Sequence, residues 1–256
     1  MTHLDRLSNL ISHFEIHAER LPSADNSNLV LTGGEDGLNK LFLYLRACPD
    51  VLDQTDAVVH ARVDIGGEDN PLFQVLPCKI VVDMKEESDI RIIAELIVKE
   101  TSAPRCGGGF ALDRLCELLV VNLLRHRIEQ QSAEPGLFAG LAHPKLSHVI
   151  VAMHDSPGRQ WQIDDFLQIA GMSRSQFMAE FQTVIGRAPI AYLKHWRMIL
   201  ARIAVLKGDR IKEIAHRYGY GSGDAFCRAF VGEYGVSPTK MVAEIKNSHS
   251  VDLSRR

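Results

Sequence analysis

Two stretches in the last third of the chain place polar side chains at the spacing of a helix surface. The side chains predicted to point outward are Arg174, Ser175, Met178 and Gln182 in the first stretch, and Gly223, Asp224, Cys227 and Arg228 in the second. An amphipathic helix buries one stripe of side chains and leaves the opposite side in solvent. Arginine, serine and glutamine on that side can bond to the donors and acceptors that base pairs expose in the major groove of DNA.

These stretches belong to an internal repeat, because the pattern FxxxFxxxxGxxP occurs twice. Phe177 and Phe226 begin the two copies, 49 residues apart. Upstream, Gly171 and Gly219 each follow a short apolar stretch at a separation of 48, so the second copy has one more residue in its turn. Each copy predicts two helices joined by a turn, and its two Phe residues, four apart, would dock on the preceding helix.

A further helix is predicted between the two copies, beginning at Pro189 and ending before Gly208. It would be about 25 Å long at about 1.5 Å per residue. Two helices that enter successive major grooves on one face of DNA lie about 34 Å apart, so a rigid spacer suits two DNA-reading units. The alternative is a helical bundle in which two hairpins merely pack together.

Residues 211–241, IKEIAHRYGYGSGDAFCRAFVGEYGVSPTKM, resemble the C-terminal signature of the AraC/XylS family of bacterial transcription regulators. Residues 161–198 resemble that family's first helix-turn-helix and spacer. The resemblance implies that double-stranded DNA and RNA polymerase are partners, and that the bases are read by Ser175, Met178 and Ala179 together with the four outward residues of the second stretch. Arg228 is the strongest single candidate, because an arginine there can donate two hydrogen bonds to a guanine.

The sequence departs from this family pattern in both reading helices. Ala179 and Glu180 stand where family members often carry basic or amide residues, and residues 231–233 replace a stretch that is commonly basic. Fewer contacts to phosphate mean weaker DNA binding that depends less on salt. We therefore expect the protein to need a dimer or a bound effector to hold its DNA site.

The charge of the chain is divided unevenly. Residues 1–144 contain 13 Lys and Arg against 22 Asp and Glu, a net charge of −9, whereas residues 145–256 contain 16 against 10, a net charge of +6. A basic C-terminal part joined to an acidic N-terminal part is typical of a DNA-binding domain attached to a regulatory domain. Two solvated faces of opposite sign are the alternative.

The N-terminal half is predicted to be a small β domain followed by helices. Residues 10–100 alternate between apolar and polar types in the manner of strands. The clearest strands are predicted over 12–18, 41–45, 57–63 and 78–82, and turns over 23–28, 32–37 and 66–71. After Pro104 the period changes, and residues 110–131 predict a long helix whose apolar side either packs on the β domain, forms an association surface, or does both. The segments HFEIHAERL and CGGGFALDRLCELLVVNLLRH are similar to the cupin-type effector domain of one AraC subgroup, with a shortened centre that lacks the barrel's ligand-lining histidines.

The chain has five cysteines with no CxxC spacing, so free thiols are expected. The cupin subgroup that the N-terminal half resembles includes an oxidant sensor, and two thiols could form a redox switch. Cys48 and Cys106 are the candidates, because an arginine lies close to each in sequence and a neighbouring cation favours the thiolate. The alternative for any one cysteine is a small buried apolar residue.

Composition excludes several classes of protein. With 46% hydrophobic and 24% charged residues in a chain of 256, the protein is globular, and no apolar run approaches the roughly 18 residues of a membrane span. We expect a cytoplasmic protein that does not bind membranes. His13 and His17 have no third ligand, so neither a metal nor another cofactor is expected. A metal-dependent cupin enzyme with a helical tail is thereby disfavoured.

Together these patterns predict an α+β protein in three parts. Residues 1–104 are a small cupin-like β domain, residues 105–144 a linker and dimerisation helix, and residues 145–247 an all-α DNA-binding domain with two helix-turn-helix motifs joined by a spacer helix. The predicted function is sequence-specific transcription regulation, with the β domain sensing a small molecule or an oxidant or forming a homodimer. The alternative that also binds DNA is a non-specific architectural protein.

Overall fold

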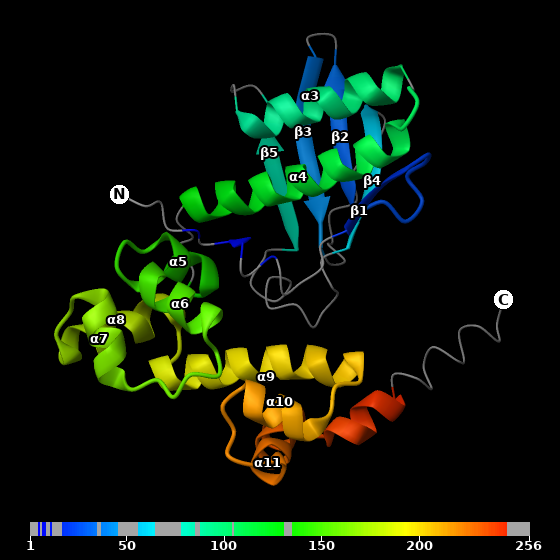
Figure 1. The fold of residues 1–256 in the computed structure, drawn as a ribbon. Helices are drawn as coiled ribbons and strands as arrows, with labels where there is room; N and C mark the ends of the chain where they lie inside the picture. The colour runs from blue at the N-terminus through cyan, green and yellow to red at the C-terminus, as the bar shows by residue number, and fades with distance from the viewer. Residues whose placement is uncertain are drawn as a thin grey trace. The chain divides into compact units, whose positions relative to one another are not determined.

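The structure is a computed structural model that describes residues 5, 7–8, 11, 17–34, 37–45, 56–64, 78–84, 88–103, 105–130 and 135–244. The chain divides into two compact units. One comprises Phe14–Ser132 and contains a sheet with two helices. The other comprises Ala133–Arg256 together with Met1–His13, and its described elements are helices (Figure 1).

Within its described residues, the first unit contains an antiparallel sheet of five strands in the order β1-β4-β2-β3-β5. The strands are β1 (His17–Leu21), β2 (Leu29–Gly34), β3 (Gly37–Tyr44), β4 (Ala57–Asp64) and β5 (Lys79–Asp83). β2 and β3 form a hairpin in which Gly34 lies opposite Gly37. Glycine suits this turn because Gly37 has a φ of 112°, which a residue with a Cβ atom rarely adopts.

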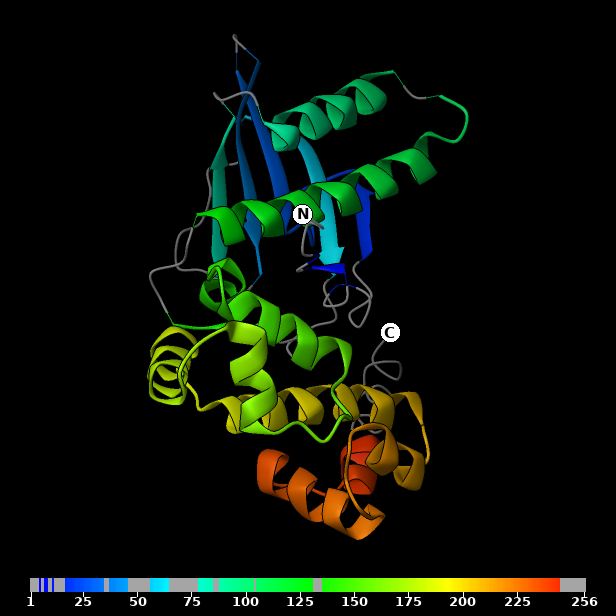
Figure 2. The ribbon, with the colours of Figure 1, turned by 60° about the vertical axis from the view of Figure 1, so that its left-hand side comes forward.

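Rows of apolar side chains cross the sheet in register. Leu31 of β2 pairs with Leu41 of β3 and with Val59 of β4, and all three are buried. Side chains alternate between the two faces along a strand, so paired residues share one face. Helices α3 (Asp89–Ser102) and α4 (Gly108–Glu129) lie side by side across one face of the sheet (Figures 1 and 2). This is the expected β domain followed by helices.

Helix α3 corrects the prediction that strands extend to residue 100. Ser88 caps the helix by accepting a hydrogen bond from the backbone N–H of Arg91. The buried residues Ile90, Ile93 and Ile97 then recur at helical spacing. Isoleucine favours strands by propensity, but packing against α4 decides the outcome here.

The strand predictions need two more adjustments. β2 is not among the strands predicted individually, and because it includes Thr32 to Gly34, the turn predicted over 32–37 begins too early. β1 begins at His17, and residues 12–16 of the predicted first strand lie outside the described residues. The strands predicted over 41–45, 57–63 and 78–82 correspond to β3, β4 and β5.

Helix α4 is the long helix that the change of period predicted. Its buried residues Leu112, Cys116, Leu119 and Leu123 lie on one side, and the helix contacts α3, β1 and β4. It therefore packs within the same compact unit as the sheet.

The second unit contains seven of the helices labelled in Figure 1. They are α5 (Leu137–Ala142), α6 (Leu146–Asp155), α7 (Ile163–Ala170), α8 (Arg174–Ile185), α9 (Pro189–Lys207), α10 (Ile211–Arg217) and α11 (Gly223–Tyr234). Among them, α7–α8 and α10–α11 form the repeat. In Figures 1 and 2, α9 joins the α7–α8 pair to the α10–α11 pair, as the spacer prediction required. None of the helices in the described part of the chain is both long and apolar enough to cross a membrane.

Aromatic packing joins the spacer helix to α6. His154 of α6 is buried, stacks on Trp196 of α9 with ring centroids 3.9 Å apart, and shares a hydrogen bond of 2.8 Å with the Tyr192 hydroxyl. A buried polar group without a partner would cost about 1–3 kcal/mol, so this bond makes burial of the imidazole tolerable. The α6–α9 contact is thus part of the core of the helical unit.

Candidate nucleic-acid interface

Helices α7 and α8 form the first helix-turn-helix. α7 ends at Gly171, which has a φ of 59° in the left-handed region. Ser173 then caps α8 by accepting a hydrogen bond of 3.4 Å from the backbone N–H of Gln176. Gly171 therefore ends α7, and Ser173 begins α8.

The paired Phe residues of α8 fasten it to α7. Phe177 and Phe181 are fully buried, and their ring centroids lie 5.5 Å apart. Phe166 of α7 lies 6.2 Å from Phe177 and continues the cluster. Full burial of each such side chain contributes about 1.5–3 kcal/mol, so this face of α8 is fixed inward and the opposite face remains in solvent.

Helices α10 and α11 repeat this construction. Gly219 lies in the turn with a φ of 77°, and Ser222 caps α11 by accepting a hydrogen bond of 3.1 Å from the backbone N–H of Ala225. Phe226 and Phe230 are fully buried with ring centroids 5.6 Å apart. The second helix-turn-helix thus has the same anchors as the first.

The predicted reading face of α8 is largely in solvent. Arg174, Ser175, Ala179 and Gln182 are exposed, and Met178 is half-buried. The Arg174 guanidinium lies 3.6 Å from the Asp164 carboxylate of α7. Both side chains are mostly exposed, so this pair is screened by water and DNA phosphates could compete for the arginine.

The predicted reading face of α11 differs in charge. Asp224 and Arg228 are exposed, one turn apart, and Gly223 and Cys227 are half-buried. Among the residues that the structure describes, none forms an ion pair with Arg228. Its five N–H donors are therefore available to a guanine edge or to phosphate.

Three further residues lie on these exposed faces and were missed by the sequence analysis. Gln176 and Thr183 of α8 are exposed, and Val231 of α11 is 42% exposed. Helical spacing could have found them, since Gln176, Ala179 and Thr183 stand three and four residues apart, as do Asp224, Arg228 and Val231. An exposed valine can make apolar contact with a thymine methyl group.

The two helix-turn-helix motifs touch each other through the loop between α6 and α7. A Cβ atom on Gly219 would lie 2.6 Å from the Gly158 carbonyl oxygen, and a Cβ atom on Gly158 would meet the Arg217 carbonyl oxygen. The Gln160 side-chain amide donates a hydrogen bond of 3.0 Å to the Gly219 carbonyl. Only glycine permits this approach of two backbones.

The spacer helix contacts the same loop through Arg197. Its guanidinium donates to the carbonyl oxygens of Pro157 at 2.6 Å and Arg159 at 2.7 Å. Desolvation lowers the pKa of this half-buried arginine below its ordinary value, and the two carbonyl acceptors stabilise the charged form. Arg197 thus joins the spacer helix to the loop between α6 and α7.

Of the two candidate redox residues, Cys48 lies outside the described residues. Cys106 is exposed just before α4. The neighbouring Arg105 forms an ion pair with Glu100, so its charge is compensated by a carboxylate. Cys116 is buried, and desolvation raises its thiol pKa to about 12, which makes it a poor nucleophile.

Within the described ranges, no group of three or more His, Cys, Asp or Glu side chains could hold a metal ion.

Comparison with known proteins identifies both units. The model of a helix-turn-helix domain matches residues 166–244, and the model of a cupin domain matches residues 5–129. The HTH-type transcriptional regulator AlkR of Acinetobacter baylyi is 30% identical over 175 residues, which are 66% of this chain and 57% of that protein. An AraC-like transcription regulator of Streptomyces lividans, described as putative, is 34% identical over 128 residues, which are 49% of this chain and 42% of that protein.

A solved structure of the DNA-binding domain of AdpA in complex with a target DNA is also similar. It is 26% identical with a TM-score of 0.38, and the match covers 41% of this chain and 95% of that domain. The chain spans about half the length of the curated relatives it matches.

The protein is thus a two-part molecule in which a cupin domain precedes a double helix-turn-helix of the DNA-binding type. More particularly, the helix-turn-helix unit is of the AraC type, and the relatives of the chain are HTH-type transcriptional regulators and not enzymes.

Proposed function

We propose that the protein is a sequence-specific transcription regulator in which α8 and α11 enter successive major grooves of double-stranded DNA. The observation that supports this most directly is the repeated construction of the two motifs. Each has buried phenylalanines on one side of its second helix and exposed polar residues on the other. Gly158, Gly219 and Arg197 join the motifs, so both helices are presented together.

In this proposal the residues have different roles. Arg228 reads a guanine through two hydrogen bonds, and Gln182 and Ser175 bond to base edges or phosphate. Met178, Ala179, Gly223 and Cys227 set the shape of the two surfaces, while Asp224 disfavours phosphate near it. Because Arg174 is the only cation in α8 and Arg228 the only one in α11, each half-site is bound weakly.

The weakness of one subunit favours a homodimer. Ile92 and Leu96 of α3 are 57% and 46% exposed, and Phe110 and Leu118 of α4 are 74% and 46% exposed. Each pair lies at the spacing of a single helix face, and exposed apolar patches mark association surfaces. We therefore assign dimerisation to these two helices, and sedimentation of the full chain over a range of concentrations tests it.

The first unit is proposed to sense an effector. Gly33, Val58, Arg91, Glu95 and Lys99 are among the residues that line a cavity of about 620 Å³ between the β2–β3 hairpin, β4 and α3. That volume is within the usual range for small-molecule sites. Oxidation at Cys48 and Cys106 is the other proposed signal.

The proposed domain boundaries are 1–104 for the sensor, 105–144 for the linker and dimerisation helix, and 145–247 for the DNA-binding domain. RNA polymerase is the proposed second partner and the cytoplasm the proposed location, because a regulator acts at promoters there. The proposed function involves no catalytic step.

Selection of binding sites from random DNA tests the proposal. The full-length chain is used at fixed salt, with and without a mild oxidant. Recovery of one asymmetric motif with two half-sites about one helical turn apart is the expected result. A difference between the selections with and without oxidant would show that oxidation of thiols controls DNA binding. If the chain binds the random DNA without enriching any motif, a non-specific architectural protein is favoured instead.

A further inference from the structure

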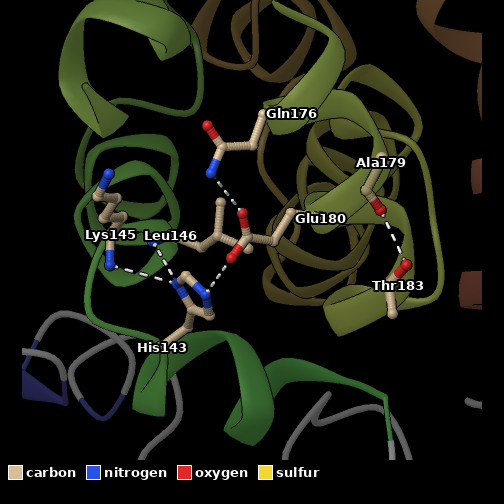
Figure 3. Close-up of polar contacts among 7 residues, drawn as sticks. All are labelled: His143, Lys145, Leu146, Gln176, Ala179, Glu180 and Thr183. Carbon is tan, nitrogen blue, oxygen red and sulfur yellow. Dashed lines mark hydrogen bonds and ion pairs between the residues drawn. The ribbon is translucent and has the colours of Figure 1, made fainter. Parts of the chain in front are cut away.

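Glu180 is the only acidic residue of α8, and it is half-buried at the edge of the exposed face of that helix. Its side chain is 32% exposed, and one carboxylate oxygen lies 2.8 Å from the Nε2 atom of His143 (Figure 3). The Gln176 side-chain amide approaches the other oxygen at 3.5 Å. The carboxylate is thus directed towards the turn between α5 and α6.

The backbone fixes the tautomer of His143. Its Nδ1 atom accepts hydrogen bonds from the backbone N–H groups of Lys145 at 3.2 Å and Leu146 at 3.1 Å (Figure 3). Lys145 is the residue before α6 and Leu146 is its first residue, where the N–H groups of a helix have no partner within it. Because Nδ1 is an acceptor, the proton of the neutral ring lies on Nε2 and is donated to Glu180.

The position of this carboxylate matters for binding a polyanion. Arg174 is the only basic residue in α8, so the formal charges of the helix cancel. B-DNA carries one negative charge per about 1.7 Å of its axis, and charges within about 8–10 Å of one another are only partly screened by physiological salt. A carboxylate of α8 released towards the DNA would therefore repel phosphate.

We propose that His143 is a positioning residue for DNA binding, which holds Glu180 against the α5–α6 turn and away from the DNA side of α8. The inference rests on the proposed function and deepens it. The ring joins three elements, since it lies at the end of α5, caps α6 and bonds to α8. Its charge-directing role is separate from its capping role, because the two use different nitrogen atoms.

The variant His143→Asn separates these roles. An asparagine Oδ1 can replace Nδ1 as the acceptor for the backbone N–H groups of Lys145 and Leu146, because it stands at the same position along the side chain. Its shorter side chain has no donor at the position of Nε2. His143→Ala removes both functions, and Glu180→Gln removes the charge alone.

The experiment measures affinity of the full-length variants for the duplex selected by the wild-type chain. We expect His143→Asn to weaken binding about five- to tenfold at low salt, with a smaller loss at high salt because the repulsion is screened. Adding Glu180→Gln to His143→Asn should restore affinity to within about twofold of Glu180→Gln alone, because no carboxylate is left to release. Asp155→Asn removes one negative charge outside α8, so the same substitution added to His143→Asn should give no such rescue.

The outcomes separate this inference from the function on which it rests. If the wild-type chain selects no duplex, the proposed function fails and the inference falls with it. If the wild-type chain binds and His143→Asn binds equally well, only the inference is overturned. It is also overturned if His143→Asn weakens binding by the same factor with Glu180 or Gln at position 180, which is the result expected of a purely structural histidine. Thermal unfolding of each variant confirms that the folded chain is compared.

Discussion

The two helix-turn-helix motifs have the same internal construction and different exposed surfaces. The Phe177–Phe181 and Phe226–Phe230 centroids are separated by 5.5 and 5.6 Å, and a serine caps each second helix. The exposed face of α8 carries mostly neutral side chains, whereas α11 carries Asp224 and Arg228 one turn apart. Packing constrains the buried residues of both copies equally, while the surfaces are free to diverge for different DNA sequences.

The motifs also differ in how their acidic residues are held. Glu180 of α8 bonds to His143 in the turn before α6, whereas Glu233 of α11 lies 2.6 Å from Nδ1 of His195 in the spacer helix. Both carboxylates stand where the sequence suggested a loss of positive charge. In each case a hydrogen bond to a histidine of a neighbouring element orients the carboxylate, which residue type alone does not reveal.

The largest expected effect tests the shared construction. Phe181→Ala and Phe230→Ala should each lower the free energy of unfolding of the helical unit by about 3–5 kcal/mol, because each removes a fully buried ring. Urea unfolding followed by tryptophan fluorescence measures this selectively, since Trp161 and Trp196 both belong to that unit. A loss below about 1 kcal/mol in one copy alone would show that its anchor is not equivalent.

The contact between the motifs gives the next effect. Gly158→Ala should lower the free energy of unfolding by about 1–3 kcal/mol, because the new methyl group meets the Arg217 carbonyl. DNA affinity should fall as well, since the two motifs can no longer approach. Gly232→Ala is the control: nothing lies within 4 Å of a Cβ there, and alanine should stabilise α11 by up to about 1 kcal/mol. Equal stabilities for the two variants would contradict the close contact.

Substitutions of Arg228 and Arg174 test how the exposed faces of α11 and α8 differ in binding DNA. Arg228→Ala should cost about 1–3 kcal/mol on the selected duplex and relax the preference at one base pair. Arg228→Lys keeps the charge but not the paired donors, so it should also lose that preference. Arg174→Ala should weaken binding to all sequences alike. It should also reduce the steepness with which the logarithm of the binding constant falls with the logarithm of the salt concentration, by about 1. Competition binding with single-base variants of the duplex distinguishes these results, and unchanged specificity in Arg228→Ala would remove it from the reading surface.

The capping serines give the smallest effect. Ser173→Ala and Ser222→Ala should each lower the free energy of unfolding by about 0.5–2 kcal/mol. The cap bond is 3.4 Å at Ser173 and 3.1 Å at Ser222, so the second loss should be the greater. Replacing each serine by aspartate should retain the cap and serves as the control. The same urea measurement decides the order.

The first unit was harder to predict because its pattern depends on distant contacts. β3, β4 and β5 followed the apolar alternation, but the Ile-rich segment of α3 has the composition of a strand. Ser88 and the helical spacing of Ile90, Ile93 and Ile97 were the available local signals. The cap and packing against α4 outweighed the β propensity of isoleucine.

The sequence by itself determined the repeated scaffold and its exposed faces. Glycine turns, serine caps and paired phenylalanines act within one or two helical turns, so their spacing is sufficient to predict them. Tertiary structure alone decided where Glu180 and Glu233 point and how Gly158 meets Gly219. His143 and Glu180 are 37 residues apart, and Gln160 and Gly219 are 59 apart. Such contacts depend on how helices pack in space, and no local periodicity encodes them.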